Sequence, residues 1–306
     1  MKGHKMRREK KNKGFTIVEL LTVMSVIMIL IGLLVPALNL VRKMATETRQ
    51  RAQFHSISVA LEFFSGENDG YPESTALPSG TGASAPFTVG AQHLAEALVG
   101  RDLQGYDTAS SWDAGADETA TSPPYGGLGT PVDIAASLDR RRGPYLTVEN
   151  VESCQVGQLY DNPGNVYDGS TTSAPVLTDV YRVRFIMATA GTVSRQLKVG
   201  SPVLYYRADT ASRIFDSTQP PADNIFNIED NEELVALGKV TAESTGHPID
   251  NINDSNGVNN FYDMITNPKV TNVNMFRPYN QNTYILISAG FDGRYGTRDD
   301  ITNFGE

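Results

Sequence analysis

The fold is decided by residues 14–38, which read GFTIVELLTVMSVIMILIGLLVPAL. Between Phe15 and Val41 the only charged side chain is Glu19. The run from Phe15 to Leu38 would form roughly 36 Å of helix, which is enough to cross a hydrocarbon core of about 30 Å. We therefore expect a transmembrane helix at residues 15–38. A secretory signal peptide fits poorly because its apolar core is only about 7–15 residues long; hydropathy alone leaves a plain signal anchor as the alternative.

The distribution of charge predicts how this helix is oriented. Residues 1–14 carry seven Lys or Arg and one Glu, whereas the rest of the chain carries 19 basic and 34 acidic residues. Because basic flanks of a transmembrane helix stay on the cytoplasmic side, we expect a cytoplasmic N-terminus and an exported body. The acidic body argues against nucleic acid as a partner.

The segment Lys13–Leu20, which reads KGFTIVEL, resembles the signal of type IV prepilins and type II secretion pseudopilins. This resemblance implies that residues 1–14 are a leader, that a prepilin peptidase cuts after Gly14, and that the new N-terminal residue, Phe15, is methylated. Glu19 is then the fifth residue of the mature chain, where the family has its glutamate. Pro36 falls at a position where the family often has a proline.

Glu19 has a physical role in this interpretation. A carboxylate at the centre of a transmembrane helix costs about 2.5–3.5 kcal/mol on insertion scales, and less near the end. In a fibre of staggered helices, the Glu19 carboxylate can pair with the Phe15 ammonium of a neighbouring subunit, where the low dielectric makes removal of one partner costly. We therefore expect Phe15 and Glu19 to act in assembly. Pro36 should kink or loosen the helix because its ring removes a backbone hydrogen bond.

The helix is expected to continue beyond the membrane. Residues 42–64 contain no Pro or Gly, and apolar residues recur there at spacings of three and four, which gives one apolar face: Phe54, Ile57, Leu61 and Phe64. A turn around Asp69–Pro72 ends the helix. The sequence thus predicts one helix at 15–66, transmembrane over 15–38 and amphipathic over 39–66, whose second half packs on a globular head formed by residues 67–306.

The head is predicted to be an α+β domain of the pilin-like class, in which a small antiparallel sheet with long loops is laid on the long helix. Residues rich in Val, Ile, Tyr and Phe predict strands at Tyr181–Met187, Pro202–Arg207 and Thr283–Ser288. Short helices are expected at Gly90–Val99 and near Asn231–Leu237, and long loops at Asp107–Pro131, Asp161–Thr178 and Thr241–Asn260.

The C-terminal loop, residues 288–304, contains three carboxylates on a glycine-rich turn: Asp292, Asp299 and Asp300. By composition alone it is a solvated hairpin or a site for a hard cation with oxygen ligands. The segment resembles the calcium loop of type II secretion major pseudopilins. This resemblance implies that the three aspartate side chains bind calcium together with the backbone carbonyl groups of Ala289 and Thr297.

The remaining features favour a structural subunit. Cys154 is the only cysteine, so no intrachain disulfide can form. Type IV pilus subunits more often close the C-terminal region with a disulfide, which favours a pseudopilin. No HExxH, GxSxG or P-loop pattern is present, and we expect no enzymatic activity.

The predicted function is therefore a structural subunit of a type II secretion pseudopilus, processed by prepilin peptidase and polymerised through its N-terminal helix. Its expected partners are pilin-like subunits in a homo- or heteropolymer and the inner-membrane assembly platform. We expect a single pass through the bacterial inner membrane, with a periplasmic head. The alternative is a minor type IV pilus pilin whose enlarged head binds a surface or substrate.

Overall fold

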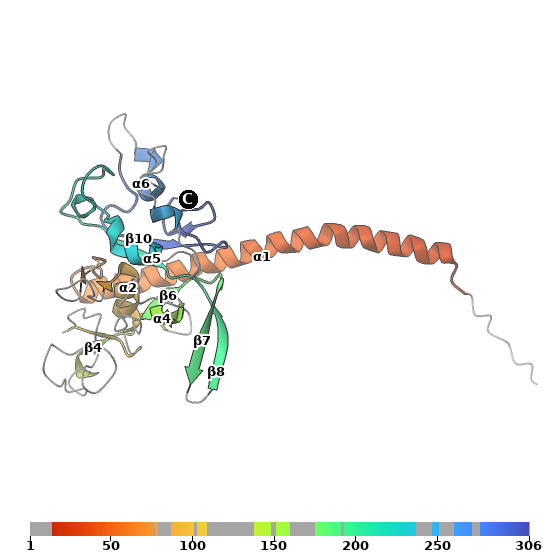
Figure 1. Cartoon of the computed structure of the whole chain (residues 1–306), viewed down its shortest axis with the longest axis horizontal. Helices are drawn as coiled ribbons and strands as arrows, with labels where there is room; N and C mark the ends of the chain where they lie inside the picture. Colours follow the sequence, from red (N-terminus) through yellow and green to blue (C-terminus); the bar gives the residue numbers. More distant parts are fainter. Residues whose placement is uncertain are drawn as a thin grey trace, which may run out of the picture. The chain divides into compact units, whose positions relative to one another are not determined.

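The computed structural model describes residues 14–75, 77–78, 87–100, 103–108, 138–147, 151–159, 175–190, 193–236, 247–250, 260–270 and 276–305. These residues form an α+β protein with one long N-terminal helix and several small antiparallel sheets (Figure 1). The chain divides into two compact units, Met1–Thr46 and Glu47–Glu306. The predicted leader lies outside the described residues, apart from Gly14.

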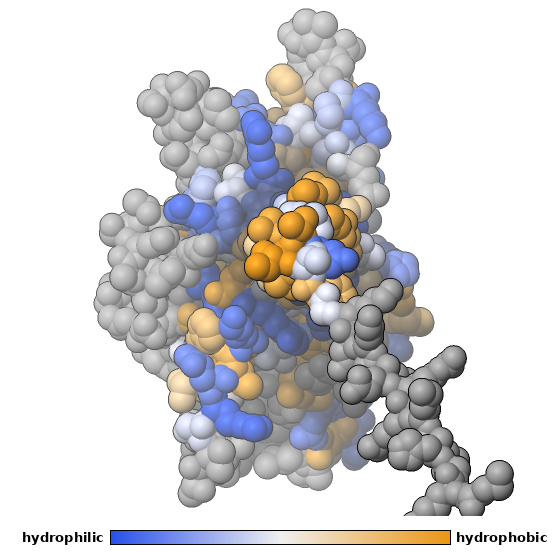
Figure 2. All heavy atoms as spheres, turned by 90° about the vertical axis from the view of Figure 1, so that its right-hand side faces the viewer, coloured by the Kyte–Doolittle hydropathy of each residue, from blue (hydrophilic) through white to orange (hydrophobic). Residues whose placement is uncertain are grey.

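The long helix is confirmed as α1, Ile17–Glu67, which continues without interruption through Pro36. Its first part is long and apolar enough to span a membrane, and the residues that the structure describes bury none of its most apolar 18-residue window. Figure 2 shows hydrophobic side chains clustered around the end of this helix. Because such a surface is unfavourable in water, it requires lipid or neighbouring helices as a cover.

The last part of α1 belongs to the second unit and is packed on one side. The predicted apolar face is confirmed, since Phe54, Ile57, Leu61 and Phe64 are each at most 3% exposed. Burial of such a side chain stabilises the fold by about 1.5–3 kcal/mol. The helix ends at Glu67, and Asp69 follows in the left-handed region with a φ of 54°.

A three-stranded antiparallel sheet forms the centre of the head. Its order is β11-β10-β9, where β9 is Leu204–Arg207, β10 is Tyr284–Ser288 and β11 is Ile301–Thr302. The predicted strands at 202–207 and 283–288 are thereby confirmed within one or two residues. In the register of β9 and β10, Leu286 lies opposite Tyr205.

Both faces of this sheet are covered. Tyr205, Tyr284 and Leu286 pack on the apolar face of α1 and on α2, Gly90–Val99, whose predicted bounds are confirmed. The alternate residues, including Tyr206 and Ile287, face a second cluster that contains Phe226 and Phe261. All five residues of β10 are buried. A strand that is buried on both faces has a nearly continuous run of apolar residues in its sequence, as β10 does.

Smaller elements surround this sheet. Four antiparallel pairs are formed by β1 (Leu77–Pro78) with β2 (Phe87–Thr88), β3 (Tyr106–Asp107) with β4 (Arg141–Arg142), β5 (Glu152–Gln155) with β6 (Pro175–Thr178), and β7 (Arg184–Ala190) with β8 (Val193–Val199). The short helices are α4 (Val156–Leu159), α5 (Glu232–Ala236) and α6 (Asn260–Ile265), with 3-10 turns η2 (Pro221–Asp223), η3 (Ile228–Asn231), η4 (Pro248–Asp250) and η5 (Pro268–Val270). The helix predicted near 231–237 is confirmed as α5.

Two sequence predictions were wrong in detail. The strand predicted from Tyr181 begins only at Arg184, because Arg182 has a φ of 51° and breaks the extended run. The loop predicted over Asp161–Thr178 includes β6, whose partner β5 lies more than a dozen residues earlier in the chain. Residues 109–131 of another predicted loop lie outside the described residues.

Candidate functional site

The predicted processing site lies at the very start of the described chain. Gly14, Phe15 and Thr16 precede α1 and belong to no helix or strand. Phe15 is 86% exposed, and no heavy atom lies within 4 Å of the position that a Cβ would take on Gly14. The residues that the structure describes therefore leave the Gly14–Phe15 peptide bond exposed. A peptide bond must be exposed if a peptidase is to cut it.

Glu19 is held by the residue that precedes the helix. The Thr16 amide and hydroxyl both donate to Glu19 Oε2, at 2.9 and 2.8 Å, and the Glu19 amide donates to Thr16 Oγ1 at 3.2 Å. This reciprocal arrangement is a capping box, in which the first helical residue is Ile17 and Glu19 occupies the third position. Glu19 Oε1 makes no hydrogen bond to the described residues.

The capping box refines the prediction made for Glu19. In the single chain one oxygen of the Glu19 carboxylate already accepts hydrogen bonds. These hydrogen bonds offset part of the free-energy cost of placing a carboxylate in an apolar segment. The other oxygen is available to a donor from outside the chain. Pro36, the third residue predicted to act in assembly, lies inside α1, where it cannot donate to the carbonyl of Gly32.

The C-terminal loop follows β10 directly and is shaped by glycines. Gly290 and Gly296 have φ values of 64° and 87°, in the left-handed region that favours glycine. A Cβ on Gly290 would lie 2.1 Å from the carbonyl oxygen of Asp299. The loop therefore folds back so that its second half passes tightly over Gly290.

Two of the three predicted calcium ligands gather around one hydroxyl group. Thr297 Oγ1 lies 2.8 Å from Asp299 Oδ1 and 3.3 Å from both Asp300 Oδ1 and the Arg294 carbonyl oxygen. A hydroxyl has one proton, so it can donate to only one of these three acceptors at a time. The surplus of oxygen acceptors fits a hard cation, which takes carboxylate and carbonyl ligands.

Backbone amides hold the other carboxylate oxygens of the loop. Asp299 Oδ2 accepts from the Asp292 amide at 2.9 Å, and Asp300 Oδ2 accepts from the Gly296 amide at 2.7 Å. Asp292 Oδ1 accepts from the Arg294 amide at 2.7 Å, so its carboxylate is engaged in its own turn. Among the described residues no group of three or more His, Cys, Asp or Glu side chains is placed to hold a metal. The structure thus brings Asp299 and Asp300 together and leaves Asp292 beside them.

The backbone ligands implied by the resemblance lie at the two sides of the loop. Ala289 is fully buried at the end of β10, and the Thr297 carbonyl accepts a long hydrogen bond of 3.4 Å from the Asp300 amide. Burial raises the pKa of Asp300 to about 8, and the nearby Asp299 carboxylate adds to this effect, against the lowering by the amides of Gly296 and Thr297. Without a cation the Asp300 anion is therefore disfavoured.

Sequence reasoning missed Asp179, whose carboxylate is hydrogen-bonded to the start of the C-terminal loop. Its Oδ1 accepts from the amides of Tyr181 and Ser201, and its Oδ2 accepts from the Ser288 hydroxyl at 2.9 Å. Ser288 Oγ in turn accepts from the Gly290 amide at 3.3 Å. Burial raises the pKa of Asp179 to about 7, although these hydrogen bonds and Arg184 lower it. No local sequence signal marks Asp179, because its partners come from distant segments.

Within the second unit, two glutamine side chains of α1 also hydrogen-bond to the backbone next to Asp179. Gln53 Nε2 donates to the Thr178 carbonyl at 2.8 Å, and Gln50 Oε1 accepts from the Val180 amide at 2.9 Å. Both glutamines are buried, at most 5% exposed. They fix the residues on either side of Asp179, namely Thr178 and Val180, against the helix, and so they help to position Asp179 under the loop.

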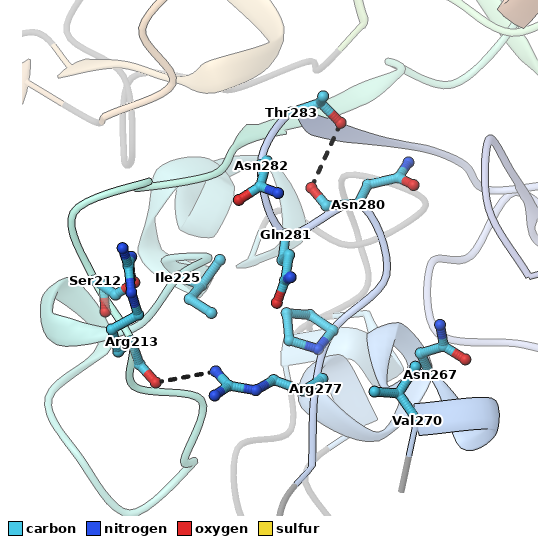
Figure 3. A pocket seen from close by; sticks show the side chains of 11 residues that line it. Ser212, Arg213, Ile225, Asn267, Val270, Arg277, Asn280, Gln281, Asn282 and Thr283 are labelled. Atoms are coloured by element: carbon cyan, nitrogen blue, oxygen red, sulfur yellow. Dashed lines mark hydrogen bonds between the residues drawn. The ribbon is translucent and has the colours of Figure 1, made fainter.

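Two of the surface cavities that the described residues line lie elsewhere on the head. Figure 3 shows the first, of about 750 Å³, into which the side chains of Arg277, Gln281 and Asn282 point. Arg277 donates to the Arg213 carbonyl at 3.3 Å, and none of the described residues that line this cavity is a carboxylate. The second cavity, of about 740 Å³, shares Arg213 and Arg277 but has an aromatic lining.

Cys154 is unsuited to nucleophilic chemistry. It is buried, and burial raises the pKa of its thiol to about 12, so the reactive thiolate is strongly disfavoured. It contributes to the hydrophobic cluster of the head.

Comparison with known proteins identifies one segment. Residues 10–35 match the family model of the prokaryotic N-terminal methylation motif, which covers Gly14, Phe15 and Glu19. No curated protein and no solved structure matches the chain. The motif indicates a type IV pilin-like protein, a structural class that a prepilin peptidase processes and that polymerises into fibres.

Proposed function

We propose that this protein is a structural subunit of a type II secretion pseudopilus. The observation that carries the proposal is the segment Gly14–Glu19, with its methylation motif, at the start of a helix that is long and apolar enough to span a membrane. Cleavage after Gly14 removes the basic leader and leaves Phe15 with a free α-amino group.

Polymerisation proceeds through α1. In the fibre, apolar side chains that the single chain exposes to lipid become buried against neighbouring helices. The free oxygen of Glu19, Oε1, accepts from the Phe15 ammonium of the next subunit, while Oε2 stays in the capping box. The resulting ion pair is favoured in a low-dielectric bundle because both charges are then compensated.

The C-terminal loop favours a pseudopilus over a type IV pilus. The chain has one cysteine and cannot close this loop with a disulfide. Calcium would be bound by Asp299 and Asp300, with Asp292 and the carbonyl groups of Ala289 and Thr297 completing the shell. A cation would remove the repulsion between Asp299 and Asp300 and supply the charge that the acceptors around Thr297 Oγ1 lack.

The membrane topology follows from the basic leader. The N-terminus lies in the cytoplasm, α1 crosses the bacterial inner membrane once, and the acidic head lies in the periplasm. Its partners are other pilin-like subunits, the prepilin peptidase and the inner-membrane assembly platform.

Disruption of the gene in its native bacterium tests the choice of machine. The measurements are the proteins secreted into the culture medium and the surface fibres seen by electron microscopy. A pseudopilus subunit predicts loss of secreted proteins with surface pili unchanged. Loss of surface fibres with normal secretion would instead favour the alternative, a minor type IV pilin whose enlarged head binds a surface or substrate.

A further inference from the structure

The two cavities of about 750 and 740 Å³ adjoin each other, since Arg213 and Arg277 line both. Two segments of the head form them, residues 212–225 and 262–283. The aromatic residues that line the second cavity pack with the cluster on the face of the central sheet that is turned away from α1. A polymer contact through α1 therefore leaves both cavities open to a ligand.

The first cavity, here the amide cavity, is rich in groups that form hydrogen bonds. Its polar lining consists of four side-chain amides, two hydroxyls and two guanidinium groups: Asn267, Asn280, Gln281, Asn282, Ser212, Thr283, Arg213 and Arg277. An amide side chain both donates and accepts hydrogen bonds, and a guanidinium group only donates them. In Figure 3, Arg277, Gln281 and Asn282 reach into the cavity from one of its two segments.

Gln281 and Asn282 occupy the two central positions of a tight turn. The Thr283 amide donates to the Asn280 carbonyl at 3.0 Å, and the Asn280 side chain donates to the Tyr284 carbonyl in β10 at 3.1 Å. The side chains of Gln281 and Asn282 are exposed and make no hydrogen bond to the described residues. A turn that is fixed to the central sheet thus presents two amide groups to the cavity.

Arg213 and Arg277 lie between the two cavities. Arg277 Nη1 donates to the Arg213 carbonyl at 3.3 Å, and Arg213 Nη1 donates to the carbonyls of Thr210 and Ser212 at 2.6 and 2.8 Å. Neither guanidinium group forms an ion pair with a carboxylate among the described residues. Because each guanidinium group has five N–H donors, several of them can bind a ligand.

The second cavity, here the aromatic cavity, combines rings with a balanced charge. Phe276 is 59% exposed, although it is large and apolar. Phe215 and Tyr262 pack edge to face beside it, with ring centroids 5.5 Å apart. Asp216 and Asp263 also line this cavity, so its two carboxylates match its two guanidinium groups.

This lining selects among classes of ligand. The balance of carboxylates and guanidinium groups gives neither an anion nor a cation an electrostatic advantage. A purely apolar ligand would take hydrogen-bonding groups out of water without replacing their partners. A neutral sugar avoids both costs. Its hydroxyl groups donate and accept hydrogen bonds, and the C–H groups of its ring can pack on the negative face of an aromatic ring.

We propose that the two adjoining cavities bind a neutral oligosaccharide. One sugar ring packs its C–H face on Phe276 in the aromatic cavity. Hydroxyl groups of a neighbouring ring exchange hydrogen bonds with Gln281 and Asn282 in the amide cavity, and Arg277 donates to the sugar oxygens between them. The site is independent of the proposed function, because a subunit of either kind of fibre could carry it.

Saturation-transfer difference NMR on the full-length chain tests this site. The chain is solubilised in a detergent without a sugar headgroup, and the probes are cellohexaose, maltohexaose, chitohexaose and the charged hexagalacturonate. We expect saturation transfer to at least one of the three neutral hexasaccharides. Its Kd should be the same at about 0.02 and 0.5 M salt, because a neutral ligand has no charge to be screened.

Two results with these probes would overturn the proposal. The first is no transfer to any of the three neutral hexasaccharides. The second is binding of hexagalacturonate alone, or a Kd that rises steeply with salt, since either would assign the cavities to an anionic ligand. The measurement requires no fibre, so its failure would leave the proposed polymer intact, and a failure to form fibres would leave the sugar site intact.

A pair of phenylalanine substitutions locates the bound sugar. Phe276→Ala should weaken binding at least fivefold, because it removes the ring on which the sugar packs. Phe185→Ala is the matched control, since Phe185 is 56% exposed on β7, away from both cavities, and it should leave the Kd unchanged. The melting temperature checks that both variants fold. An unchanged Kd for Phe276→Ala would contradict binding in the aromatic cavity.

Substitution of the turn tests the amide cavity separately. Gln281→Ala combined with Asn282→Ala should weaken binding at least fivefold and leave the melting temperature unchanged, because both side chains are exposed. Gln196→Ala, which removes an exposed amide from β8, is the matched control and should bind like the wild type. Binding that survives the loss of both turn amides would contradict a ligand that extends across the two cavities.

Discussion

Thr16 and Glu19 cap the start of α1 by reciprocal hydrogen bonds: the Thr16 amide donates to the Glu19 carboxylate, and the Glu19 amide donates to the Thr16 hydroxyl. Glu19 is thus a local helix cap through its hydrogen bonds, and the proposed assembly gives it a second, separable role as the carboxylate that pairs with the Phe15 ammonium of a neighbouring subunit. Substitutions can distinguish these roles, because glutamine can cap a helix in this way but carries no charge.

The first prediction concerns this pair. Glu19→Gln should polymerise as poorly as Glu19→Ala, since both remove the partner of the Phe15 ammonium. Thr16→Ala removes the capping hydroxyl, at a cost of about 1 kcal/mol in helix stability, and keeps the charge. It should form fibres at close to the wild-type level. The measurement is the yield of sedimentable fibres from membranes that contain the prepilin peptidase.

A different order among these variants would contradict the pairing. If Glu19→Gln formed normal fibres and Thr16→Ala did not, the carboxylate would act as a helix cap only. The membrane-inserted amount of each variant serves as the control, because an uncharged residue 19 should insert at least as well as glutamate.

The second prediction is a pH dependence to which Asp179 contributes. Burial raises its pKa to about 7, so the folded state binds a proton more tightly than the unfolded state does. The resulting stability is fully present below the ordinary aspartate pKa of about 4 and is lost as the pH rises through about 7. We expect the melting temperature in chelator to fall over this window and Asp179→Asn to reduce the fall, whereas the contribution of Asp300, whose pKa burial raises to about 8, should remain.

Asp263→Asn is the matched control for Asp179→Asn, because Asp263 is an exposed carboxylate on α6. It should leave the pH profile unchanged. A profile of Asp179→Asn that coincides with that of the wild type would show that the carboxylate is not the source of the slope.

The third prediction concerns calcium at the C-terminal loop. An ion that binds only the folded state stabilises it by about 2.7 kcal/mol at a hundredfold excess over Kd. The detergent-solubilised chain should therefore melt at a higher temperature in calcium than in chelator, and Asp300→Asn should abolish most of the difference. Magnesium should substitute poorly because it requires compact octahedral geometry. Equal melting temperatures in calcium and chelator, with no ion bound in calorimetry, would refute the site.

The fourth prediction compares two leucines of the same helix. Leu61 is fully buried in the head, whereas Leu33 is 71% exposed in the first unit. Leu61→Ala should reduce the free energy of unfolding of the head by about 2–5 kcal/mol, since it leaves a cavity in the cluster around Tyr205 and Leu286. Leu33→Ala should not change it. Chemical denaturation followed by tyrosine fluorescence measures both, and equal effects would contradict the packing described for α1.

Elements that depend on local pattern could be predicted from the sequence. The periodicity of Phe54, Ile57 and Leu61 predicted the packed face of α1, and the apolar run at 284–288 predicted β10. The methylation motif was readable because its residues are contiguous. The capping box of Thr16 and Glu19 follows the ordinary T-x-x-E pattern, so it could also have been predicted from the sequence.

Features that depend on distant residues could not be predicted in this way. Asp179 takes its role from Ser201 and Ser288, which come from other strands. Strand β8 carries Ser, Arg, Gln and Lys among its apolar residues and becomes a strand by pairing with β7. The gathering of oxygens around Thr297 Oγ1 likewise requires the backbone path through Gly290 and Gly296, which composition does not specify.

The most direct test of the account is the covalent state of the N-terminus. The chain is purified from its native membrane, and its intact mass is measured with the prepilin peptidase present and absent. With the peptidase, the chain should begin at Phe15 and carry one added methyl group; without the peptidase, it should retain the leader. A chain that still begins at Met1 when the peptidase is active would contradict the central claim that this protein is a processed, pilin-like subunit.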